Sequence, residues 1–262
     1  MIETHIVSDQ LGRRVEAPKF PKRIISLVPS QTELLFDLGV NDRLIGVTKF
    51  CIHPPDWLKS KTIIGGTKNF KFDIIEQLQP DLIIGNKEEN YLEGISELEK
   101  KYPVWMSDIY TINDALDMFT SVGSIINAEH KAALFRAELE NDLTSMEPPL
   151  KGNALYLIWK SPFMAAGGNT FINEMMKLAG FENVLKSDSR YPEISIDWIK
   201  TLHPDYILLS SEPYPFKQKH IEELEALIPN VKVKLVDGEI FSWYGSRMLK
   251  ARDYFTKLAA SV

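Results

Sequence analysis

The chain has 262 residues, of which 44% are hydrophobic and 25% are charged, a composition typical of a globular protein with one large domain or two smaller ones. Its formal net charge of −6 argues against nucleic acid as the main partner, because phosphate binding needs a basic face. No apolar run approaches the ~20 residues that a membrane-spanning helix requires. The single cysteine excludes an intrachain disulfide.

The N-terminal residues lack the basic and apolar regions of a signal peptide. The sequence therefore describes either a cytoplasmic chain or one whose signal peptide is missing from it, and the residues alone do not separate these two cases.

The first part of the chain predicts strands that alternate with helices. An apolar strand is expected at residues 23–28 and a helix at residues 31–38. A shorter helix begins near Asp73, whose carboxylate suits the positive end of the helix dipole, and stops before Pro80. A second strand follows at residues 82–84. This alternation indicates parallel βαβ units.

A long helical segment is expected at residues 111–146, either as one helix or as two that break near Gly123 or Asn127. Prolines end this segment. The prediction divides the chain into a first α/β lobe at residues 1–110, a helical connector at 111–149 and a second α/β lobe at 150–262.

The second part of the chain repeats the order of the first. A strand is expected at residues 154–159, followed by a helix that Asn169 or Thr170 caps and that stops at Gly180. A last strand is expected at residues 232–236.

An internal repeat supports this reading, because residues 193–208 align without a gap with residues 69–84. The matched pairs are Asp73/Asp197, Ile75/Ile199, Leu78/Leu202, Pro80/Pro204, Asp81/Asp205 and Ile83/Ile207. The repeat predicts an α/β fold of two three-layer lobes with mainly parallel sheets, joined by the helical connector, with a ligand cleft between the lobes.

Three segments carry a family resemblance: the turn Asp9–Arg13, the run Pro21–Ser30, and Leu78–Ile84 with its second-lobe copy. In this order and spacing they resemble the helical-backbone class of ABC-transporter substrate-binding proteins, which serve cobalamin, iron-siderophore and haem uptake. The resemblance covers almost the whole chain. It implies a periplasmic or extracytoplasmic monomer whose partner is a membrane permease. It also implies no cofactor of its own, since the corrin, ferric siderophore or haem is the transported ligand.

Within the class, the chain is most similar to cobalamin-binding members. Residues 46–55 resemble the loop that places an aromatic side chain against the corrin ring, with Phe50 at that position. Tyr191 lies where the family has an aromatic residue in the second lobe. Thr67 occupies the equivalent point of the first lobe, where a cobalamin binder can carry tryptophan. This departure leaves siderophores open as the ligand.

Four further residues are candidates for ligand binding. Trp159 and Phe163 lie near the carboxyl end of the second lobe's first strand, where ligands of open α/β sheets gather. Trp243 follows the last strand and is expected to form a wall, because binding clefts are lined by aromatic side chains. Arg247 either has a structural role or pairs with an anionic group of the ligand.

The resemblance also implies a role for Asp73 and Asp197. The family docks onto arginines of the permease through an acidic residue on the rim of each lobe, and these aspartates occupy the equivalent positions. The alternative is helix-start electrostatics alone, worth ~0.3–1 kcal/mol at each exposed site.

Other motifs carry little chemistry. Cys51 and His53 could bind zinc, but a zinc site needs three or four ligands, so no metal site is predicted. The segment 167–170 lacks the spacing of a nucleotide-binding loop and is read as a capped turn. Because the sequence has no nucleophile–base pair, the chain is predicted not to be an enzyme. The alternative is a cytosolic tetrapyrrole- or metal-handling enzyme of the same fold.

Overall fold

The computed structural model describes residues 3–146 and 148–261, and their contacts divide the chain into two compact units. The first unit takes the chain up to Ile109, with residues 113–139 and 244–247. The second unit takes residues 110–112, 140–243 and the chain from Met248 onward. The chain therefore passes from one unit to the other more than once.

The first unit is built on a parallel sheet of five strands. In spatial order these are β5 (Thr62–Ile63), β4 (Leu44–Val47), β3 (Ile24–Ser26), β8 (Leu82–Asn86) and β9 (Val104–Ser107). Strands β3 and β8 are buried along their whole length. Such burial is expected where helices cover both faces of a parallel sheet.

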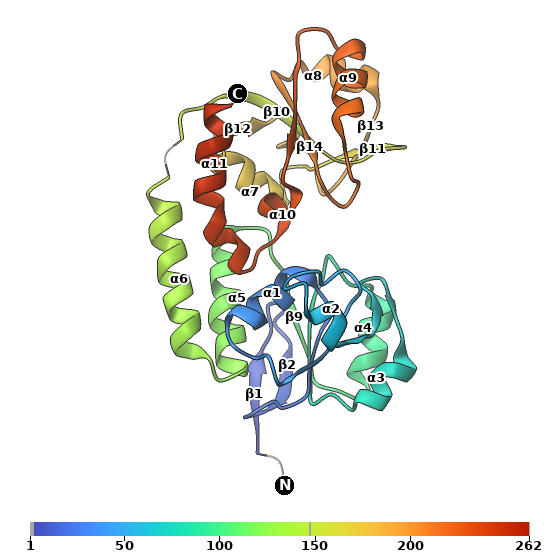
Figure 1. Ribbon diagram of the computed structural model, residues 1–262, viewed down its shortest axis with the longest axis vertical. Helices are drawn as coiled ribbons and strands as arrows, with labels where there is room; N and C mark the ends of the chain where they lie inside the picture. The colour runs from blue at the N-terminus through green and yellow to red at the C-terminus, as the bar shows by residue number, and fades with distance from the viewer. Residues whose placement is uncertain (1–2, 147, 262) are drawn as a thin grey trace. The chain divides into compact units, whose positions relative to one another are not determined.

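Helices pack on both faces of this sheet. The helices in this part of the chain are α1 (Pro29–Asp37), α2 (Trp57–Ser60), α3 (Phe72–Leu78), α4 (Leu92–Glu99), α5 (Ile112–Ile125) and α6 (Glu129–Thr144), of which residues 140–144 belong to the second unit. Helices α3 and α4 lie on one side of the strands, and α5 lies on the other (Figure 1). Two hairpins complete the unit: β1 (Thr4–Ser8) with β2 (Arg14–Pro18), and β6 (Gly65–Gly66) with β7 (Asn69–Phe70).

Helix α1 begins earlier than the sequence predicted. The expected start was Gln31, but the helix already includes Pro29 in its first turn. The fixed φ of proline suits that position, and the N–H that proline lacks would have had no partner within the helix. Gly39 follows the helix with φ +91°, a conformation that glycine adopts without a steric penalty.

The predicted helical segment between the two halves of the sequence forms two helices, α5 and α6. The chain turns between them at Asn127, which has φ +58°. The two helices pack closely at Gly123, since a Cβ built there would lie 2.4 Å from the Cβ of Ala132. Gly123 therefore serves close helix packing, and Asn127 is the break.

The second unit is built on a mainly parallel sheet. Its strands run in the order β13 (Glu193–Ile194), β11 (Phe163–Ala165), β10 (Gly152–Trp159), β14 (Tyr206–Ser210) and β15 (Lys232–Val236), with β12 (Phe181–Asn183) also paired to β10. Strand β11 pairs with both β10 and β13 in the antiparallel sense. Strands β12, β14 and β15 join the sheet through parallel pairs.

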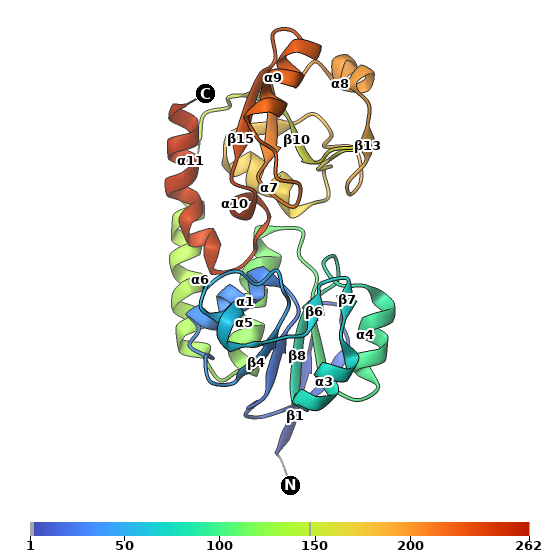
Figure 2. The same cartoon turned by 45° about the vertical axis from the view of Figure 1, so that its right-hand side comes forward.

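Helices cover both faces of this sheet as well (Figure 2). The elements are α7 (Phe171–Leu178), α8 (Ile196–Leu202), α9 (Gln218–Leu227), α10 (Gly238–Ser242), the 3₁₀ turn η1 (Ser246–Lys250, which begins in the first unit) and α11 (Ala251–Ala260). On one face, Leu157 and Leu209 form a core with Ile199 of α8 and Leu224 of α9. On the other, Tyr156 stacks on Phe241 of α10 at 5.0 Å.

The internal repeat is visible in the helix ends. Helices α3 and α8 both end at a left-handed residue, Gln79 with φ 46° and His203 with φ 45°. A proline follows each of these residues. The shared ending reflects the same local requirement, because the chain must leave the helix and turn sharply into a central strand.

The repeat extends to the contacts of the aspartates that follow. A carboxylate oxygen of Asp81 accepts the Arg23 N–H at 2.8 Å, and one of Asp205 accepts the Asn153 N–H at 2.8 Å. In both units these bonds join the repeat to the strand that pairs with it. The two-lobe α/β class with mainly parallel sheets is thus confirmed.

Candidate ligand-binding site

Phe50 and Thr67 line one pocket of the first unit, with a volume of about 580 Å³. Phe50 follows β4, and Thr67 lies in the turn between β6 and β7. The Phe50 side chain is 50% exposed, which is unusual for so large an apolar group. Its ring lies over a glycine, since a Cβ on Gly66 would lie 3.2 Å from the Phe50 Cε2 atom. The tertiary structure thus brings two predicted ligand-binding residues together.

The loop that carries Phe50 is anchored from inside by Cys51. The buried thiol accepts a hydrogen bond from the Thr32 hydroxyl at 3.1 Å and lies 3.2 Å from the Thr48 hydroxyl. Burial raises the pKa of the Cys51 thiol, which disfavours the thiolate that zinc would require. Across residues 3–146 and 148–261, no three His, Cys, Asp or Glu side chains gather as a metal site would need.

Three lysines also line the Phe50 pocket: Lys49, Lys68 and Lys71. The Lys49 ammonium lies 4.9 Å from the centre of the Phe50 ring. The Lys68 ammonium donates to the carbonyls of Glu88 and Asn90, at 2.6 and 3.3 Å. Sequence reasoning missed all three, although Lys49 and Lys68 are the chain neighbours of residues that it singled out.

In the second unit, Trp159 ends β10 and is 40% exposed. Its ring packs edge-to-face on Tyr214, with centroids 5.6 Å apart. Tyr214 in turn packs edge-to-face on Phe216, with centroids 4.7 Å apart. Sequence reasoning missed Tyr214. The available signal was its position just beyond β14, since the carboxyl ends of parallel strands share one edge of a sheet.

Phe163 and Tyr191 flank the antiparallel strands of the second unit. Phe163 begins β11, pairs with Ile194 of β13, and packs partly against the core on the α8 face. Tyr191 is half-buried and precedes β13. Trp159 pairs with Met164 of β11, so one sheet carries Trp159 and Phe163 on adjacent strands.

Trp243 lies mostly inside the second unit, with 6% of its surface exposed. Its indole N–H donates to a Glu212 carboxylate oxygen at 2.7 Å, and the Ser242 hydroxyl donates to the same atom at 3.0 Å. Burial raises the pKa of Glu212, although both hydrogen bonds act in the opposite direction. Trp243 therefore offers little surface for a ligand wall and instead holds a buried carboxyl group.

Arg247 belongs to the first unit, where it forms a buried ion pair with Glu33 of α1. Its Nε and Nη2 atoms both donate to the carboxylate at 2.8 Å. This bidentate geometry matches the fork of the guanidinium. Of the two roles considered for Arg247, the geometry favours the structural one.

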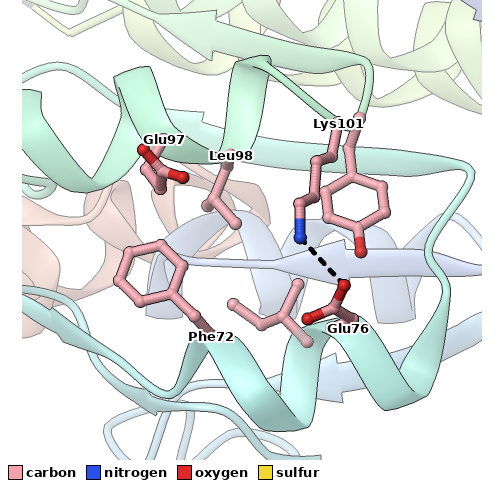
Figure 3. A pocket seen from close by; sticks show the side chains of 7 residues that line it. Phe72, Glu76, Glu97, Leu98 and Lys101 are labelled. Carbon is pink, nitrogen blue, oxygen red and sulfur yellow. Dashed lines mark hydrogen bonds and ion pairs between the residues drawn. The ribbon is translucent and has the colours of Figure 1, made fainter.

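Asp73 and Asp197 are exposed in the first turns of α3 and α8. Beside Asp73, Phe72 lines a second pocket of about 300 Å³ between α3 and α4 (Figure 3). Lys101 crosses this pocket to reach Glu76 at 2.8 Å. The Glu76 charge is therefore balanced locally, whereas no partner of Asp73 appears among the hydrogen bonds and ion pairs of the described residues.

Comparison with known proteins decides the family. The profile of the periplasmic binding protein family matches residues 24–232. The chain belongs to this family. An uncharacterised ABC transporter substrate-binding lipoprotein of Bacillus subtilis is 24% identical, with 93% of this chain and 82% of the relative covered. The vitamin B12-binding protein of Vibrio campbellii is 27% identical, with 72% and 70% covered.

A solved structure shares the fold. The periplasmic heme-binding protein of Pseudomonas aeruginosa superposes with a TM-score of 0.79 at 18% identity, over 92% of each chain. The two curated relatives are a substrate-binding lipoprotein of a transporter and a vitamin B12-binding protein. The chain is accordingly a transporter's substrate-binding protein and not an enzyme. None of the described helices is long and apolar enough to span a bilayer.

Proposed function

We propose that this protein captures a corrin, ferric siderophore or haem outside the cytoplasm and delivers it to the permease of an ABC importer. The observation that carries the proposal is the pocket shared by Phe50 and Thr67. It lies beyond the carboxyl end of β4, where ligands of open α/β sheets bind, and it presents a half-exposed aromatic ring. A flat macrocycle gains dispersion energy and apolar burial on such a ring.

The proposed contacts of the first unit are Phe50 and Thr67, and those of the second are Trp159, Phe163 and Tyr191. Trp243 and Arg247 act on the site through the segments that they hold, because their side chains are almost fully buried. The exposed Trp159 ring, supported by Tyr214, provides a second stacking surface.

A binding titration tests the ligand. Purified protein is titrated with cyanocobalamin, haem and a ferric siderophore, while tryptophan fluorescence and visible absorption are followed. We expect saturable binding of at least one ligand without chemical turnover. Phe50→Ala should weaken that binding by about 10-fold, since a stacked aromatic contact contributes about 1 kcal/mol beyond its buried area.

The matched control is Phe20→Ala, which removes another exposed phenylalanine of the first unit, one that does not line the pocket. It should leave the affinity unchanged. Absence of binding by all three ligands would contradict the proposed cargo. Equal changes of affinity in Phe50→Ala and Phe20→Ala would show that the ligand does not bind at Phe50.

We also assign permease docking to Asp73 and Asp197, which occupy equivalent exposed positions of the internal repeat. The double variant Asp73→Asn/Asp197→Asn should bind ligand normally but lose at least half of its stimulation of ATP hydrolysis by the reconstituted transporter. Asp253→Asn is the control, because Asp253 is also exposed in a first helical turn, that of α11. If the control and the double variant have equal effects, Asp73 and Asp197 do not dock onto the permease. Their role is then limited to electrostatic stabilisation of the helix start.

A further inference from the structure

The charge of the Phe50 pocket differs from that of the molecule as a whole. The chain has a formal net charge of −6, yet Lys49, Lys68 and Lys71 line this one pocket and no aspartate or glutamate lines it. The lysines come from three separate places: the second residue after β4, the β6–β7 turn, and the residue before α3. Their convergence is therefore a property of the fold and not of a single basic run.

None of these lysines is neutralised by a carboxylate among residues 3–146 and 148–261. The Lys68 ammonium is held by backbone carbonyls, and the Lys49 ammonium lies near the Phe50 ring. Carbonyl and ring contacts orient a cation but leave its full charge in place. The pocket thus combines an apolar stacking face with uncompensated positive charge.

The Lys49 side chain is positioned together with the ring. A Cβ on Gly66 would lie 3.5 Å from the Lys49 Cε atom and 3.2 Å from the Phe50 Cε2 atom. Both side chains therefore lie across the same glycine backbone. The Lys49 ammonium lies over the Phe50 ring, 4.9 Å from its centre, so a ligand that reaches this ring also comes within reach of the ammonium.

We infer that the cargo of this protein is an anion: a flat or chelated-metal ligand whose carboxylates or deprotonated oxygens contact Lys49 and Lys71. This inference rests on the proposed function and narrows it. An uncharged corrin, whose periphery carries amides, would leave the lysine charges uncompensated. Haem, with two carboxylates, and ferric catecholate chelates, with anionic oxygens, both supply the complementary charge.

Ligand pairs that differ only or mainly in charge test the inference. Haem is compared with its dimethyl ester, which has the same ring without the carboxylates. A ferric tris-catecholate chelate is compared with an uncharged ferric tris-hydroxamate chelate, and cyanocobalamin serves as the uncharged corrin. We expect the native protein to bind at least one anionic probe, and to bind it at least 10-fold more tightly than its uncharged counterpart.

Protein variants test whether the preference for anionic ligands comes from the pocket lysines. Lys49→Gln/Lys71→Gln should weaken binding of the anionic probe by about 5- to 20-fold, since each exposed charge pair contributes only modestly. Lys68 is kept, because it also holds the chain after β8. The control is Lys22→Gln, an exposed lysine just before β3, at the amino ends of the parallel strands. It should leave the affinity unchanged, and raised salt should weaken only the binding that depends on the pocket lysines.

The outcomes separate this inference from the proposed function. Tight binding of cyanocobalamin or of the uncharged chelate, with no preference for the anionic probes, would overturn the charge inference and keep the transport proposal. An unchanged affinity of the double lysine variant would do the same. Failure of every probe to bind would remove the proposed cargo itself.

Discussion

Arg247 and Glu33 form a buried ion pair that ties residues 244–247 to α1 within the first unit. Both side chains are about nine-tenths buried, so the two charges compensate each other where little solvent reaches them. Removing one partner leaves a buried charge without its bidentate counterion, whereas removing both leaves neither charge of the pair. Substitutions in this pair therefore test how much the ion pair contributes to the attachment of residues 244–247.

The first prediction concerns this pair. Arg247→Met should lower the free energy of unfolding by about 3–5 kcal/mol, because it removes the bidentate counterion of the buried Glu33 carboxylate. The double variant Arg247→Met/Glu33→Leu should recover most of that loss. Urea denaturation measures both, with exposed Arg14→Met as the control. Additive losses in the double variant would show that the two charges do not compensate each other.

Glu212 supports a prediction about pH. Because burial raises its pKa in the folded protein, its contribution to stability is complete below the unfolded glutamate pKa of about 4.3. That contribution is lost as the pH rises through the raised pKa of the folded state. Glu212→Gln keeps an oxygen that can accept from Trp243 and Ser242, but it cannot ionise.

The variant should therefore gain stability relative to the native protein as the pH rises from 4 to 7, by about 1 kcal/mol. Urea denaturation across this range checks the sign. Glu222→Gln, at an exposed position of α9, serves as the control. A stability difference that shrinks with rising pH would contradict the raised pKa of Glu212.

At the scale of elements, α3 and α8 are the two copies of one helix. Both end in a left-handed residue that is not glycine, and such residues carry a steric cost. Glycine removes that cost. In α3, the Gln79 side chain returns a hydrogen bond to the Glu76 carbonyl, which offsets part of the strain.

His203→Gly should therefore stabilise the protein by about 0.5–1 kcal/mol, measured as an increase in the free energy of unfolding. Lys200→Gly, inside α8, should instead cost about 1 kcal/mol, because glycine is unfavourable within a helix. Destabilisation by both substitutions would mean that His203 makes a contact worth more than its backbone strain.

At the scale of the whole molecule, two units of related design lie in one chain that crosses between them repeatedly. Ligand that binds only the folded protein should stabilise it by mass action. At 100 times the dissociation constant, the gain in the free energy of unfolding should be about 2.7 kcal/mol. Thermal denaturation with increasing haem or ferric chelate measures this gain. Phe50→Ala should reduce it, and Phe20→Ala should not.

Much of the fold could be predicted from local signals. The helix stops at Pro80 and Pro204, the parallel strands around them, and the break at Asn127 all follow from residues close in the chain. Proline geometry, helix capping and apolar periodicity act over a few residues, so the sequence displays them directly. The repeat then related the two halves.

The candidate site was only partly predictable. Phe50 and Thr67 were identified by resemblance and do line one pocket. Tyr214 and the three pocket lysines were missed, because no local pattern shows which remote side chains they will lie beside, even for Lys49 next to Phe50. Trp243 was expected to form a ligand wall; its side chain is mostly buried, with the indole N–H bonded to Glu212.

The sequence by itself determined that this chain folds as two related α/β units with mainly parallel sheets. It also predicted which strand ends a ligand would approach. Only the tertiary structure decided that Arg247 meets Glu33 and that Lys49, Lys68 and Lys71 line one pocket with Phe50. The physical reason is distance along the chain. Backbone conformation depends mainly on residues that are close in the sequence. Charge pairing and pocket composition depend instead on which remote segments the completed sheets bring together.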